Sequence, residues 1–364
     1  MILYSQPGFF DIKNRIAKLT SLGDPLVKLN AEIDFEDFRS DLNRIHEKER
    51  KSHAGAKPFN VILMFKILIL QHLYNLSDDG IEYQIRDRIS FMRFLGLQME
   101  DRVPDAKTVW LFRERLKALG LIKDLFARFD KQLAQRGYVA KTGQMIDATF
   151  VEAPRQRNSR EENAKIKSGE IPDGWDAPEK GAQRRQKDID ARWTKKNHET
   201  HYGYKNHVNA DQATKLIQHY AVTPANVHDS QMFEALLDTT PPCEKGQKRA
   251  VYADSAYRSE RHEARLVELG LESQIHEKGT RAASLTEEQQ TLNQQKSKVR
   301  ARVEHIFGAQ AAMGGHIVRT IGLDRAKVKL GLMNLVYNMK RLLQLIVLKS
   351  RHLAQDTLAL SAAA

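Results

Sequence analysis

The sequence predicts an α/β protein in which a mixed β-sheet is flanked by helices and preceded by an all-helical region. Three observations predict this class. Apolar residues recur at spacings of three and four, the helical period, from about Asn60 to Gln135. At Gly143 the pattern changes to short apolar runs bounded by turn residues, which are typical of strands. The first strands are placed to pair as hairpins and the later ones alternate with helices, which favours a mixed sheet.

In the helical region, the first helix carries apolar residues over residues 60–76, and Ser77–Gly80 interrupts the pattern. The helical pattern resumes over Ile81–Leu95. Asp105 is suited to cap a further helix, and Trp110 on that helix is expected in the core. The apolar stripe of this last helix consists of Val109, Phe112, Leu116 and Leu119. Such a compact group of helices is compatible with a helix-turn-helix.

After Gly143 the elements follow in a readable order. Residues 155–200 are highly charged and poor in aliphatic side chains, so we expect a mobile insertion there rather than core. Its two tryptophans, Trp175 and Trp193, are expected to be free to stack on an unpaired base. The expected strands are Gln144–Val151, Tyr202–Ala210, Leu216–Thr223, Ala250–Ala253 and Gly270–Ile275, with a hairpin turn at Asp211–Thr214. The expected helices begin near Asp229, Ser259 and Leu285, and Asp324–Leu348 closes the chain.

These patterns predict four segments. Residues 1–57 form an N-terminal segment, and residues 58–140 form a helical region suited to DNA binding. Residues 141–350 form the α/β domain with the charged insertion at about 155–200. Residues 351–364 form a C-terminal tail.

The composition narrows the class of partner. The chain has 364 residues, 41% of them hydrophobic, and a formal net charge of +12. An excess of Lys and Arg favours a polyanion such as DNA, because each contact with a phosphate releases condensed counterions. An anionic membrane surface would also suit this charge, but no sustained basic amphipathic segment supports that alternative. Cys243 is the only cysteine, which fits a reducing cytoplasm. No secretory signal is evident, and Val61–Leu76 is too short and too broken by polar residues to span a bilayer.

Three acidic residues stand where chemistry is expected. Asp147 lies inside a predicted strand, Asp254 ends another, and Glu304 lies in the helical run 299–307. Burying a carboxylate is unfavourable unless its charge is compensated, and Mg²⁺ prefers oxygen ligands of this kind. Two such ions about 3.5–4 Å apart serve phosphodiester cleavage and transfer. The alternatives are ordinary ones: a local hydrogen bond for Asp147, a turn cap for Asp254, and an ion pair with Arg300 for Glu304.

Seven short segments resemble the insertion-sequence-five group of bacterial transposases. They occur in the family's order and spacing over roughly residues 58–348, nearly the whole chain. The segments are Tyr-Asn-Leu-Ser-Asp (74–78), Ile-Asp-Ala-Thr (146–149), Glu-Ala-Pro (152–154), His-Tyr-Gly-Tyr-Lys (201–205), Asn-Val-His-Asp (226–229), Asp-Ser-Ala-Tyr (254–257) and Arg-Ala-Arg-Val-Glu-His-Ile-Phe (300–307).

The resemblance implies an RNase H-like catalytic core in which Asp147, Asp254 and Glu304 are the catalytic acids and hold Mg²⁺, for which Mn²⁺ substitutes. It implies a helical region that binds the terminal inverted repeats of the element. It also implies cleavage and strand transfer of double-stranded DNA by a homodimer or larger assembly. Two positions depart from the family: Ser297 stands where Tyr is common and Ala311 where Lys is common.

Basic side chains are the candidates for contact with DNA. The alternative for each is a solvated surface charge. The candidates are Arg113, Arg115, Lys117, Lys205, Arg258, Lys296, Lys298, Arg300 and Arg302. His228 and Asp229 are a weaker pair: Asp229 is suited to cap a helix, or the two are auxiliary groups near the metal.

Two other functions remain open from the sequence. A related nuclease would carry the same acids and cut DNA without joining strands. A non-catalytic DNA-binding protein descended from a transposase would retain binding alone, although the presence of all three acids disfavours it.

Overall fold

The computed structural model describes residues 8, 10–47, 57–138, 143–175, 177, 181–196, 198–240, 248–279 and 284–363. Cys243 lies outside these residues. The chain divides into two compact units, one formed by Met1–Arg128 with Leu342–Ala364 and the other by Phe129–Arg341. The segment boundaries predicted at residues 57, 140 and 350 stay a prediction.

The first unit is helical, as the apolar spacing predicts. Its helices are α1 (Asp11–Ser21), α2 (Pro25–Glu32), α3 (Arg39–Asn43), α4 (Val61–Tyr74), α5 (Asp78–Asp87), α6 (Ile89–Leu95), α7 (Ala106–Ala118) and the first part of α8 (Ile122–Gln135), with short 3₁₀ turns η1 (Glu36–Phe38) and η2 (Arg44–His46). Of the 14 residues of α4, ten are buried. This central helix therefore provides much of the unit's core.

Side-chain caps set where several of these helices begin. The Asp105 carboxylate accepts the N–H of Thr108 at 2.7 Å, so the predicted cap of α7 is confirmed. Ser77 caps α5 in the same way, accepting the N–H of Gly80 at 3.0 Å. The interruption expected at 77–80 therefore lies slightly earlier. It begins at Asn75, whose left-handed backbone (φ 51°) ends α4.

Two residues of α7 differ from the prediction. Val109, Phe112 and Leu116 are buried, but Leu119 is 43% exposed because it lies beyond the last turn of the helix. Trp110 is 40% exposed, so its expected place in the core is wrong. Helical spacing predicted the stripe correctly but could not show how far neighbouring elements cover it.

Among the described residues no single helix is long and apolar enough to cross a membrane; α4 and α5, bent by 100° between them, pass that test only as a pair and by length and composition alone.

The second unit contains a six-stranded mixed sheet. Its strands are β1 (Gly143–Glu152), β2 (Arg192–Lys196), β3 (Glu199–Asp211), β4 (Ile217–Pro224), β5 (Ala250–Ala253) and β6 (Glu272–Ile275). The strand order is β2-β3-β1-β5-β6, and β4 also pairs with β3. The pairs among β1 to β4 are antiparallel, whereas β1–β5 and β5–β6 are parallel. This mixed arrangement confirms the predicted fold class, an RNase H-like sheet with flanking helices.

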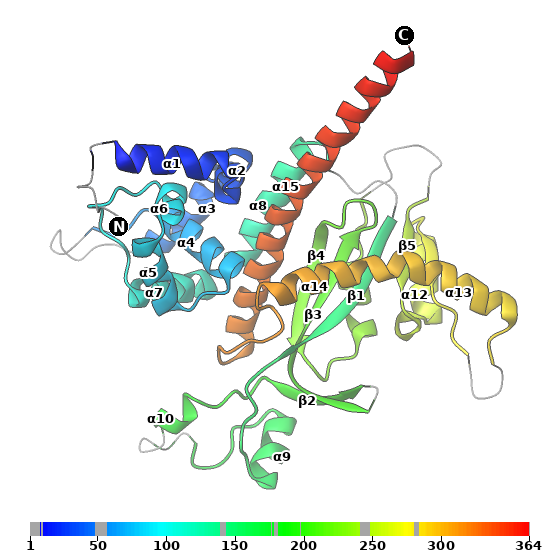
Figure 1. Cartoon of the computed structure of the whole chain (residues 1–364). Helices are drawn as coiled ribbons and strands as arrows, with labels where there is room; N and C mark the ends of the chain where they lie inside the picture. The colour runs from blue at the N-terminus through cyan, green and yellow to red at the C-terminus, as the bar shows by residue number, and fades with distance from the viewer. Residues whose placement is uncertain are drawn as a thin grey trace, which may run out of the picture. The chain divides into compact units, whose positions relative to one another are not determined.

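Helices cover both faces of this sheet (Figure 1). They are α11 (Phe233–Leu236), α12 (Glu260–Glu268), α13 (Glu287–Arg300), α14 (Glu304–Ala312) and α15 (Leu323–Ala363), with 3₁₀ turns η4 (Asp229–Met232), η5 (Ser255–Tyr257) and η6 (Ala301–Val303). On one face Ile146 packs with Phe233, Leu236 and Leu266. On the other face Val151 packs with residues of α15. Figure 1 shows α13 and α14 crossing the strands on this second face, almost end to end.

The charged insertion is more ordered than the composition predicts. It contains α9 (Arg160–Ser168), α10 (Gly181–Arg184) and β2, which extends the sheet beside β3. Trp175 is 3% exposed, and its indole N–H donates to Glu162 at 2.9 Å, so this ring is not free to stack on a base. Trp193 is 45% exposed.

Candidate active site

The two aspartates lie level with each other on neighbouring parallel strands. Gly143 of β1 pairs with Ala250 of β5, and Met145 pairs with Tyr252. The same register, continued by two residues, sets Asp254 opposite Asp147. Because side chains alternate between faces along a strand, both carboxylates point to the same side of the sheet. Strand pairing therefore brings together two acids that are far apart in the sequence.

Asp147 is nearly enclosed at this position. The residue is only 6% exposed to solvent. Its Oδ1 accepts the N–H of Ala148 at 2.8 Å, and its Oδ2 accepts from Nη1 of Arg300 at 2.6 Å. Burial raises the pKa of Asp147 from 3.8 to about 6, although the Arg300 guanidinium and the Ala148 N–H oppose this rise. The charges of Asp254 and Glu304 raise this pKa further.

Glu304 is placed by a change in helix type. The α13 helix ends at Arg300, the three residues of η6 follow, and Glu304 begins α14. Its side chain is exposed, and its charge acts on Asp147. Asp254 and Glu304 are thus both near enough to Asp147 for their charges to raise its pKa.

The donor atoms suit a hard divalent cation, but their arrangement here does not form a metal-binding group. Three carboxylates that repel one another are the ligands Mg²⁺ prefers. Among the residues that the structure describes, however, no three Asp, Glu, His or Cys side chains are close enough to hold an ion. The guanidinium of Arg300 instead contacts one carboxylate oxygen of Asp147.

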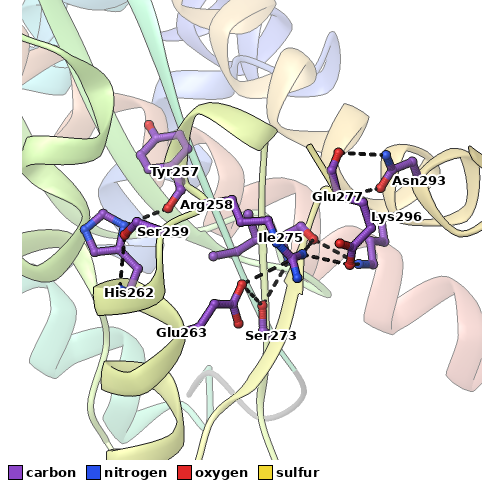
Figure 2. Close-up of polar contacts among 10 residues, drawn as sticks. All are labelled: Tyr257, Arg258, Ser259, His262, Glu263, Ser273, Ile275, Glu277, Asn293 and Lys296. Carbon is purple, nitrogen blue, oxygen red and sulfur yellow. Dashed lines mark hydrogen bonds and ion pairs between the residues drawn. The ribbon is translucent and has the colours of Figure 1, made fainter. Parts of the chain in front are cut away.

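Arg258 and Lys296, both predicted to contact DNA, are held by acceptors beside the site (Figure 2). Arg258 donates to Glu277 at 2.8 Å and to the Ile275 carbonyl at 3.2 Å, and it also lies 3.8 Å from Glu263. Lys296 donates to the same carbonyl at 2.9 Å and lies 3.6 Å from Glu277. The two cations thus link the end of β6 to α12 and α13.

Lys205 lies on the opposite face of the sheet from Asp147, because it pairs with Phe150 of β1. It is 7% exposed and donates to Asp229 and to the Val227 carbonyl, both at 2.8 Å. Asp229 is therefore a buried counterion. His228 caps η4 and bonds to Ser230 at 2.7 Å.

The remaining basic candidates differ in whether they pair with an acid or are exposed to solvent. In α7, Arg113 bonds to both oxygens of Asp78 at 2.8 and 2.7 Å, Lys117 pairs with Glu114, and Arg115 is exposed. In the second unit, two candidates are exposed next to Arg300: Lys298 and Arg302. DNA contact by any of these residues stays a prediction.

Sequence reasoning missed His276. It directly follows β6, just as Asp254 directly follows β5, and its N–H donates to the Ala253 carbonyl at 3.1 Å. Burial and the charges of Arg300 and Lys296 lower the pKa of His276, against the opposite effect of Asp254. The apolar run that marked Asp254 has no counterpart here, because β6 is Glu-Ser-Gln-Ile and only Ile275 is buried, so the local sequence carries no comparable signal.

Comparison with known families decides the kind of protein. A family model described as "Transposase DDE domain" matches residues 140–339, more than half of the chain, and spans the sheet and the three acids. A second model, described as "Transposase domain (DUF772)", matches residues 14–115 in the helical unit. The chain belongs to the DDE transposase family.

One solved structure similar to this transposase is that of the piggyBac transposase synaptic complex with hairpin DNA. The two chains are 14% identical with a TM-score of 0.44, and the match covers 88% of this chain and 74% of the other.

Proposed function

We propose that this transposase binds the terminal inverted repeats of its own insertion sequence, cuts the DNA at the element's ends and joins the freed 3′ ends to target DNA. Asp147, Asp254 and Glu304 are its catalytic acids. The observation that carries this proposal is the parallel register of β1 and β5, which sets Asp254 opposite Asp147 on one face of the sheet. The electrostatic effect of Glu304 on Asp147 supports the third acid.

The reaction needs a divalent cation in this proposal, Mg²⁺ with Mn²⁺ as a substitute, held by the three acids. Such an ion lowers the pKa of bound water and stabilises the charge that develops on phosphate oxygens. Arg300 has to leave the Asp147 oxygen for the ion to bind there. Double-stranded DNA is the substrate for both steps, and joining two ends of one element requires a homodimer or a larger assembly on DNA.

The test uses purified protein and a plasmid carrying the DNA that flanks the gene, with Mg²⁺, Mn²⁺ or EDTA. Cutting at the ends and joining to a second plasmid are scored separately. We expect both activities in the wild type with metal and neither in Asp254→Asn. Asp324→Asn is the matched control, because Asp324 is exposed on α15 and pairs only with Lys327 at 3.1 Å among the contacts described.

Each other outcome selects a different function. Cutting without joining, with paired ends supplied, would identify a nuclease. Binding of the flanking DNA with neither activity in Mg²⁺ or Mn²⁺ would identify a non-catalytic descendant. Full activity in Asp254→Asn would refute the assignment of the acids.

A further inference from the structure

His276 continues the row of side chains formed by the two aspartates. Ala253 of β5 pairs with Ile275 of β6 in parallel, and the next residues along the two strands are Asp254 and His276. The N–H of His276 donates to the Ala253 carbonyl at 3.1 Å, which keeps this register. Adjacent strands lie about 4.8 Å apart, so the imidazole is one strand spacing from Asp254 and two from Asp147. All three side chains point to the face covered by α13.

The α13 helix crosses over this row and contacts it twice. The Nε2 atom of His276 lies 3.3 Å from the hydroxyl oxygen of Ser297. One helical turn later, Arg300 bonds to Asp147 at 2.6 Å. Both His276 and Ser297 are only partly buried, so solvent reaches them.

At His276 the charges of two cations, Arg300 and Lys296, outweigh the charge of Asp254. Lys296 donates to the carbonyl of Ile275, the residue before His276, and Arg300 is one turn beyond Ser297. An imidazole N–H and a serine hydroxyl beside two cations offer donors to a phosphate oxygen.

We propose that His276, together with Ser297, binds a backbone phosphate of the DNA strand next to the bond that is cut, and so sets the position of the scissile bond over Asp147 and Asp254. This inference rests on the proposed function. It adds a substrate-binding residue, contributed by β6, to the three acids.

A chemical double-mutant cycle tests the contact. Duplexes that end at the cleavage site found on the plasmid are made with a single uncharged methylphosphonate at each position around that site. Their affinity for wild type, His276→Ala, His276→Gln and Ser297→Ala is measured in EDTA. At one position we expect the methylphosphonate to weaken wild-type binding by about 10-fold or more, because a hydrogen bond to a charged group is lost. In His276→Ala the same methylphosphonate has no further effect.

His276→Gln retains an N–H donor, so it should recover part of both the affinity and the response to that one phosphate. Thermal unfolding of each variant separates loss of contact from loss of fold. A methylphosphonate effect that is the same in wild type and His276→Ala at every position would overturn the proposal. So would a His276→Ala variant whose only change is in its Mn²⁺ requirement.

The two proposals fail in different ways. Wild-type cutting that is lost in Asp254→Asn, combined with no coupling between His276 and any phosphate, would refute the phosphate contact alone. A wild type that cuts no flanking DNA would refute the proposed function, and the contact with it.

Discussion

Replacing Asp147 with asparagine should make the metal-free protein more stable at neutral pH. The fold disfavours the ionised carboxylate, because burial raises its pKa from 3.8 to about 6 even with Arg300 beside it. Moving a pKa by that amount corresponds to about 3 kcal/mol between the two protonation states. The raised pKa means that the stabilising contribution is present below pH 3.8 and lost as the pH rises through about 6. Asparagine is neutral at every pH and avoids that loss.

The measurement is urea unfolding of both proteins in EDTA at pH 8 and below pH 3.8. At pH 8 we expect Asp147→Asn to be more stable by up to about 3 kcal/mol, with no advantage at the acidic pH. Adding Mg²⁺ or Mn²⁺ should stabilise only the wild type. A variant that is less stable at pH 8, or whose advantage does not change with pH, would refute the reasoning.

Asp238→Asn is the control with the opposite sign. Asp238 is also buried, but hydrogen bonds from Thr240 and Arg249 outweigh the effect of burial and lower its pKa. Its Oδ2 lies 2.6 Å from Nη2 of Arg249, whose side chain is fully buried. The change to asparagine removes this counterion of the buried guanidinium, so we expect a loss of about 3–5 kcal/mol at pH 8.

Three further predictions follow from contacts elsewhere in the chain. Burial lowers the pKa of His207 from 6.5 to about 4, so its contribution to stability is present above pH 6.5 and lost as the pH falls toward 4. His207→Gln should therefore make the unfolding free energy depend less on pH between 6.5 and about 4. Gly203→Ala should destabilise the protein by about 1–3 kcal/mol in urea unfolding, because the residue has φ 149° and a Cβ would lie 2.7 Å from the Ala153 nitrogen. Gly308→Ala is the control, because the space around Gly308 is open and the substitution should not destabilise the protein. Arg113→Met should lower the melting temperature, because it breaks the ion pair with Asp78. Arg115 is exposed, so Arg115→Ala should weaken DNA binding in a titration and leave the melting temperature unchanged. Equal melting temperatures for the two variants would contradict this division.

The sequence by itself determined the features that depend on neighbours along the chain. Period-two alternation set Asp147 inside β1, and a short apolar run ending in a carboxylate marked Asp254. The cap at Asp105 and the hairpin turn that begins at Asp211 were predictable, because each depends on hydrogen bonds to residues two or three positions away. Such local rules predicted the class of fold, whereas the resemblance to transposases assigned the roles of the three acids.

Only the tertiary structure decided which side chains meet. Whether a basic residue is exposed depends on acids that are distant in the sequence: Arg113 is held by Asp78 from another helix, and Arg300 by Asp147 from the sheet. His276 became a candidate only when the register of β5 and β6 set it beside Asp254. The physical reason is the same in each case. Burial and charge pairing depend on distances in space, and strand register converts residues more than a hundred positions apart into neighbours about 5 Å from each other.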